Sequence, residues 1–120
     1  MIQKFEIDED APVESLLFTF GGAEAVATIH PGTVLVTSTR DCFAGLVRST
    51  ADVTSQVCDP RFLNPQTGPF FVEGAKPGDT IAVHFMRIEP RYTWGVSTTV
   101  PFFGALTGTR DTALLQPALP

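Results

Sequence analysis

The stretch FFVEGAKPGDTIAVHFMRI, residues 70–88, carries the clearest structural signals in the chain. Its first part, residues 70–74, is a short apolar run that predicts a β-strand. Pro77 and Gly78 then predict a tight turn, because proline presets φ at the second turn position and glycine accepts the positive φ of the third. Residues 80–88 alternate between two faces that are both mostly apolar, which predicts a central strand covered on both sides.

A similar strand-turn-strand pattern lies upstream, around Pro31 and Gly32. Residues 25–29 lead into this turn, and the β-branched run at residues 33–39 leaves it as a second predicted strand. Two further strands are expected nearer the amino terminus, at residues 4–8 and 15–20.

Two stretches lack the period of a strand. Residues 52–57 are compatible with a short helix or a mobile excursion. Residues 64–69 predict a rigid irregular loop, because neither of the two prolines in this stretch can donate a backbone hydrogen bond to a neighbouring strand. Gly and Pro together number 20 of 120 residues, while Val, Ile and Thr number 31, which favours short strands joined by tight turns. We therefore predict a mainly β domain over residues 1–120, a β-sandwich or distorted barrel with Pro/Gly-rich loops.

Charge and cysteine content narrow the class of protein. The net charge of −5 excludes a strongly basic nucleic-acid binder, and no run approaches the length of a membrane span. The first ten residues are acidic where a signal peptide would be basic and apolar, so we expect a cytoplasmic protein. Cys42 and Cys58 lie 16 residues apart without zinc-ligand spacing, and we expect two buried or unrelated thiols, with a disulfide or a catalytic thiol as the alternatives.

Residues 64–79, NPQTGPFFVEGAKPGD, resemble the acetamidase/formamidase family, whose members carry an NPxTGPxxVxGAxPGD stretch before a long hydrophobic strand. Residues 31–41, PGTVLVTSTRD, are similar to a second segment of that family. Residues 101–104 look like its PGFG-type loop, with Phe102 in place of the first glycine. The resemblance extends over roughly residues 29–120.

The resemblance implies hydrolysis of short aliphatic amides to a carboxylate and ammonia on a mainly β scaffold. The family's Asp/His/Glu-rich segments, thought to supply the metal-binding and catalytic centre, lie farther toward the carboxyl end and have no counterpart in this sequence. The chain therefore resembles the amino-terminal part of such an enzyme. It is expected to be a fragment, a cleavage product or a subunit of a split enzyme in a homo- or hetero-oligomer. A divalent metal such as zinc would then be bound mainly by a companion chain or a further segment.

Asp41 is the best candidate for a catalytic residue, because it lies where a predicted strand meets a loop and a carboxylate there can reach into a pocket. Most of this interpretation rests on the family resemblance of residues 31–41, which include Asp41. The alternatives are that Asp41 caps the following turn or pairs with Arg40. Glu73 is a weaker candidate for binding substrate at a cleft, and it can equally be a charge on the edge of a sheet. Phe103 is a second weak candidate for substrate binding.

Other chemistry-bearing residues have structural interpretations. His84 is expected to be a hydrogen-bonded core histidine, His30 to be structural, and Asp79 to belong to its turn. A minor alternative uses Cys42 as a nucleophile with a histidine as its base. We also expect the apolar patch formed by residues 100–104 with Leu114 and Leu115 to be buried by another chain or a continuation. The alternative function is a non-catalytic β-rich binding or regulatory module, in which this patch and the Pro/Gly loops bind a protein.

Overall fold

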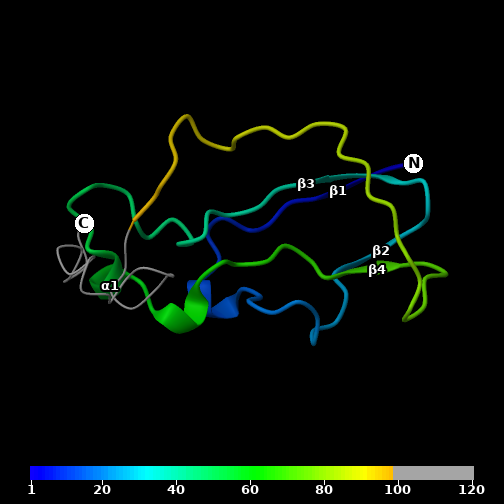
Figure 1. The fold of residues 1–120 in the computed structure, drawn as a ribbon, viewed down its shortest axis with the longest axis horizontal. Helices are drawn as coiled ribbons and strands as arrows, with labels where there is room; N and C mark the ends of the chain where they lie inside the picture. The colour runs from blue at the N-terminus through cyan, green and yellow to red at the C-terminus, as the bar shows by residue number, and fades with distance from the viewer. Residues whose placement is uncertain (99–120) are drawn as a thin grey trace, which may run out of the picture.

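Two pairs of parallel strands organise the chain in the computed structural model, which describes residues 1–98. β1 (Ile2–Phe5) lies beside β3 (Val34–Thr37), and β2 (Ala27–Ile29) lies beside β4 (Phe70–Val72). Figure 1 shows the β1–β3 pair running above the β2–β4 pair. The mainly β prediction is confirmed, although the described strands form two separate two-stranded sheets and no closed barrel.

The first Pro-Gly turn connects the two pairs. Its backbone closes by a bond of 3.1 Å from the Thr33 N–H to the His30 carbonyl, and Gly32 has the positive φ of 81° that this turn requires. The predicted turn is confirmed. It does not form a hairpin, because β2 and β3 belong to different sheets, and the turn therefore passes the chain from one sheet to the other.

Side chains join the sheets to each other. The Phe5 and Phe70 rings meet edge to face with centroids 5.4 Å apart, which is a favourable aromatic geometry. The Gln3 side-chain amide donates a hydrogen bond of 3.0 Å to the Thr28 carbonyl. Strand β1 therefore contacts both strands of the other pair.

The helical elements are short: η1 (Val13–Ser15), α1 (Thr54–Val57) and η2 (Pro60–Phe62). Helix α1 confirms the helical alternative for residues 52–57. Thr54 at its start is 2% exposed and shares a 3.0 Å hydroxyl hydrogen bond with Thr98. The buried apolar residues among those described are Ile7, Ala44 and Val47. Within residues 1–98, no helix has the length and apolarity that crossing a membrane requires.

The prediction of a strand at residues 15–20 is wrong. Pro12 instead starts the short helix η1, and the Ser15 hydroxyl donates to the Pro12 carbonyl at 2.7 Å. Only Leu17 makes a β-bridge, to Gln66, and Phe20 is 97% exposed. Hydrogen bonds from side chains to nearby backbone groups compete with the backbone hydrogen bonds of a β-sheet in this segment. The apolar run alone therefore does not produce a strand.

The strand predicted at residues 80–88 is also absent from this chain. The segment is irregular and exposed along its whole length, and His84 is exposed instead of lying in a core. A strand needs a hydrogen-bonded neighbour, and the described residues offer none to this segment. Residues 100–104, Leu114 and Leu115, where we expect a buried patch, lie outside the described residues.

The loop predicted at residues 64–69 is confirmed as irregular, and it holds other segments in place. The Asn64 N–H donates to the Cys42 carbonyl at 2.8 Å, and the Thr67 hydroxyl donates to the Ser38 carbonyl at 2.7 Å. The loop therefore fixes the segment that follows β3. We call the two bonds the loop clamp.

Gly68 is required in this loop by its backbone. Its φ is +114°, a conformation that side chains rarely adopt, and an added Cβ would lie 3.3 Å from the Phe70 ring and backbone nitrogen. We expect Gly68→Ala to lower the free energy of unfolding by about 1–3 kcal/mol, which urea denaturation measures. Gly95→Ala is the matched control, since nothing lies within 4 Å there, and it should change stability by less than about 0.5 kcal/mol. Equal effects of the two substitutions would contradict the strain at Gly68.

Candidate functional site

Asp41 lies at the start of a tight turn, four residues after the end of β3 at Thr37. Its Oδ1 accepts a hydrogen bond of 2.8 Å from the Phe43 N–H, and its carbonyl accepts one of 2.9 Å from the Ala44 N–H. Ala44 is buried and has a positive φ of 53°, so the turn is tightly constrained. The interpretation of Asp41 as a turn cap is therefore confirmed.

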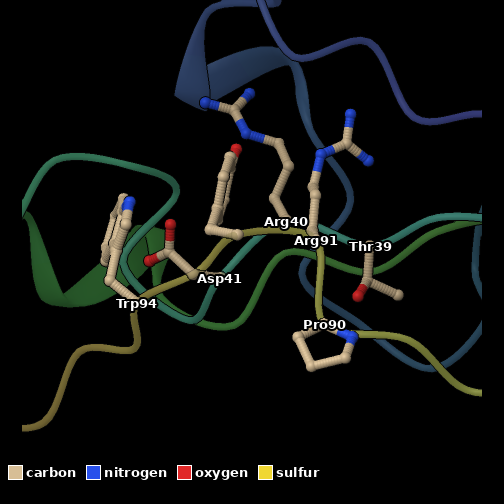
Figure 2. A pocket seen from close by; sticks show the side chains of 7 residues that line it. Thr39, Arg40, Asp41, Pro90, Arg91 and Trp94 are labelled. Carbon is tan, nitrogen blue, oxygen red and sulfur yellow. The ribbon is translucent and has the colours of Figure 1, made fainter.

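Arg40 does not pair with Asp41, so that alternative is wrong. The Arg40 guanidinium donates to the Ala11 carbonyl at 2.9 Å and to the Ala44 carbonyl at 2.7 Å. Figure 2 shows the guanidinium groups of Arg40 and Arg91 pointing away from the Asp41 carboxylate. Among the described residues, no hydrogen bond or ion pair engages Asp41 Oδ2, which leaves this half-buried carboxylate one oxygen for a ligand.

A cavity of about 240 Å³ opens beside Asp41. One wall is the Tyr92 ring stacked on the Trp94 ring, with centroids 5.1 Å apart and planes inclined by 13°. Glu9 fixes this wall, since it accepts a 2.9 Å hydrogen bond from the Tyr92 hydroxyl and forms a 3.0 Å ion pair with Arg91. The cavity is lined by Thr39, Arg40, Asp41, Pro90, Arg91, Tyr92 and Trp94.

This arrangement suits a small, planar, polar ligand. The free oxygen of Asp41 can accept a hydrogen bond from an N–H or O–H group of the ligand. The aromatic wall offers π-faces against which a planar group can stack. A carboxylate beside a fixed aromatic surface in a small cavity therefore combines one orienting polar group with apolar contact.

Glu73 lies at a different place in the fold. It follows β4, and its carboxylate pairs with Nδ1 of His30, which follows β2. The cavity that Glu73 lines shares no residue with the cavity that Asp41 lines, so the structure does not bring the two candidate carboxylates together. A second cavity of about 550 Å³ opens beside Glu73, and its lining includes Asp79 and Ile81.

Asp79 belongs to its turn, as predicted. Its carboxylate accepts a 2.8 Å hydrogen bond from the Lys76 N–H, and its own N–H donates to the Lys76 carbonyl at 3.0 Å. Phe103, the third candidate for the site, lies outside the described residues. The roles of Asp41, Glu73 and Phe103 in catalysis or binding stay predictions.

The two cysteines are free thiols near Asp41. Partial burial of the thiol raises the pKa of Cys42, and the Asp41 carboxylate raises it further. The pKa of Cys58 is raised by partial burial, by Asp41 and by Cys42. Since the thiolate is the nucleophilic form, a raised pKa opposes the thiol route through Cys42.

Residues 1–98 contain no group of three or more His, Cys, Asp or Glu side chains that could hold a metal ion. The residues that the structure describes therefore do not form a site for the divalent metal that the family resemblance implies. We derive no catalytic step through a metal from them.

Sequence reasoning did not identify the wall of the cavity. Tyr92 and Trp94 lie one and three positions after Arg91. Two aromatic residues this close to an arginine were a local pattern that could have indicated a binding surface. Glu9 had no such signal, because it lies 83 residues from Tyr92 and only the fold brings them together.

Comparison with known proteins adds two findings. Residues 22–114 match the model of the Acetamidase/Formamidase family. An acetamidase from Yersinia enterocolitica, known from a crystal structure, is similar with a TM-score of 0.68 and 30% sequence identity. This similarity covers 100% of the present chain and 36% of the acetamidase chain, so the present chain spans well under half of that protein. No curated protein matches the chain.

The proximity of Asp41 to the thiols can be tested directly. Asp41→Asn keeps an oxygen that can accept from the Phe43 N–H but removes the negative charge, so the pKa of Cys42 should fall. We expect alkylation of Cys42 by iodoacetamide at pH 8 to accelerate by up to about tenfold, the effect of one pKa unit. Mass spectrometry of quenched samples measures this rate for each cysteine.

Asp10→Asn is the matched control, because it removes the same charge from a residue that does not affect either thiol. It should leave both alkylation rates unchanged. An Asp41→Asn chain whose Cys42 reacts no faster than wild type would contradict the charge interaction.

Proposed function

Because the chain belongs to the acetamidase/formamidase family, we propose that it is the amino-terminal part or a subunit of an amidase that hydrolyses short aliphatic amides to a carboxylate and ammonia. The observation that carries the proposal is the family match over residues 22–114, which includes Asp41 and the lining of its cavity. The similar acetamidase is much longer than this chain, so the activity is proposed for a larger protein or assembly.

In this proposal Asp41 is the residue of the chain that acts in the reaction. Its Oδ2 accepts a proton from the attacking water while the water oxygen bonds to the amide carbon. The C–N bond then breaks, and the proton passes to the departing nitrogen, which leaves as ammonia. The hydrogen bond from the Phe43 N–H to Oδ1 supports this role, because it fixes the carboxylate with Oδ2 free.

The aromatic pair Tyr92 and Trp94 is proposed to form one side of the substrate site. A formamide or acetamide molecule is planar and small, which suits a cavity of about 240 Å³. Glu9 would act as a positioning residue, since it holds Tyr92 and Arg91 from the opposite side of the cavity wall.

The rest of the site is proposed to come from outside the described residues. A divalent metal such as zinc would be bound there, and a companion chain or further segment would supply its ligands and complete a homo- or hetero-oligomer. A metal would supply Lewis-acid polarisation of the amide carbonyl. The assembled enzyme is proposed to be cytoplasmic.

The division of the site between two polypeptides predicts that the chain by itself is inactive. Purified chain should release no ammonia from formamide or acetamide above background, even with added zinc. Ammonia release should begin when the chain is mixed with a polypeptide comprising the part of the Yersinia enterocolitica acetamidase that this chain does not cover. A coupled ammonia assay measures both conditions.

Turnover by the chain alone would contradict the division of the site. A complex of the two polypeptides that forms but releases no ammonia with zinc present would favour the non-catalytic binding module.

The role of Asp41 predicts a specific loss in the assembled enzyme. Asp41→Asn should fold and assemble normally while lowering kcat by about a hundredfold or more, as expected for a lost acid-base group. Asp79→Asn is the matched control, because Asp79 caps a turn at the other cavity and should leave kcat within about twofold. Full activity of Asp41→Asn would leave Asp41 only its turn-capping role.

A further inference from the structure

The charge of Asp41 has no positive partner among the described residues. Its side chain is half-buried, and the donor that reaches Oδ1 is the neutral Phe43 N–H. Arg40 immediately precedes Asp41, yet its guanidinium binds the carbonyls of Ala11 and Ala44 instead. Within residues 1–98, no ion pair therefore neutralises the Asp41 carboxylate.

Arg91, the second cation that lines the cavity, is engaged elsewhere as well. Its guanidinium forms its 3.0 Å ion pair with Glu9. Figure 2 shows the Asp41 carboxylate turned toward Trp94, while the guanidinium groups of Arg40 and Arg91 point away from it. A negative ligand beside Asp41 would therefore meet a carboxylate instead of a guanidinium, so the cavity favours a positive ligand.

The aromatic wall favours a cation too. The stacked rings of Tyr92 and Trp94 line the same cavity as Asp41. The face of an aromatic ring carries negative charge density and attracts a cation that lies within about 6 Å of the ring centroid. A carboxylate without a positive partner beside two such rings is a combination that recognises organic ammonium ions.

We propose that this cavity binds a short primary alkylammonium ion. Its N–H groups would donate to Asp41 Oδ2, and its alkyl group would contact the rings of Tyr92 and Trp94. The volume of about 240 Å³ suits an alkyl chain of a few carbons. This ligand goes beyond the proposed amide substrate, because it carries a positive charge and undergoes no reaction.

One consequence of the site rests on the proposed function. Ammonia takes up a proton at neutral pH, and the ammonium ion that results is the smallest member of this class of ligand. The product of amide hydrolysis would therefore bind beside Asp41, and ethylammonium should compete with acetamide in the assembled enzyme.

Fluorescence tests the binding in the chain itself, because Trp94 is its single tryptophan. Ethylammonium chloride, added at constant ionic strength, should change the Trp94 emission with half-saturation at about 1–50 mM, since so small a ligand makes few contacts. Ethanol has the same number of non-hydrogen atoms without the charge, and sodium acetate carries the opposite charge. Both should bind at least about tenfold more weakly than ethylammonium. A response to ethylammonium that does not saturate, or equal affinity for ethanol or acetate, would overturn the proposal.

Asp41→Asn tests the carboxylate. This substitution removes the charge, so it should weaken ethylammonium binding at least about tenfold. Glu24→Gln is the matched control, because Glu24 is exposed and does not line the cavity, and its affinity should stay unchanged. Equal affinities of the two variants would overturn the location of the site, since the total charge of the chain would then explain any effect.

Two substitutions of Tyr92 test the aromatic wall while Asp41 stays in place. Tyr92→Leu removes a ring face and should weaken ethylammonium binding at least about threefold. Tyr92→Phe keeps the ring and loses only the hydrogen bond to Glu9, so its affinity should stay closer to that of the unsubstituted chain. Equal affinities of the two Tyr92 variants would overturn the contribution of the ring.

The ammonia assay separates this inference from the proposed function. Saturable binding of ethylammonium to the chain, with no ammonia release from the assembled polypeptides, would support the cation site and count against the amidase function. Ammonia release by an assembly whose chain does not bind ethylammonium would support the amidase function and overturn the cation site.

Discussion

The loop clamp, in which the Asn64 N–H binds the Cys42 carbonyl and the Thr67 hydroxyl binds the Ser38 carbonyl, is the constraint on which the site depends. Both donors come from residues 64–79, the stretch that resembles the family motif, and both acceptors flank Asp41. Backbone carbonyls in a half-buried loop need partners, and this loop obtains them from residues that lie more than twenty positions away. Residues 64–79 therefore support the segment that contains Asp41, in addition to forming β4.

The turn cap at Asp41 is compatible with the proposed role of this carboxylate in the reaction. One carboxylate oxygen caps the turn, and among the described residues nothing donates a hydrogen bond to the other, while Asp41 is one of the residues that line the cavity. A carboxylate held at one oxygen loses little further side-chain entropy when it binds a ligand, which is the advantage of a preorganised group. Arg40 contributes by binding the carbonyls of Ala11 and Ala44, so it stabilises the loop and leaves the charge of Asp41 unneutralised.

The chain is internally ordered but incomplete in its pairing. Its described strands are joined two by two and its buried apolar residues are few. Within residues 1–98, no backbone hydrogen bond joins residues 80–88 to another segment, and all of residues 80–88 are exposed. Exposed apolar area on this scale marks a surface that another element covers.

Reasoning from the sequence predicted the strands β3 and β4, both Pro-Gly turns, the family and the turn at Asp41, because these depend on neighbouring residues or on an unbroken motif. It did not determine whether the runs at residues 15–20 and 80–88 form strands, because a strand exists only where a partner is available. The tertiary structure alone placed Glu9 against Tyr92, put Glu73 and Asp41 beside different cavities and turned Arg40 toward backbone carbonyls. Those contacts join residues that are distant along the chain, and no local pattern encodes which of them will meet.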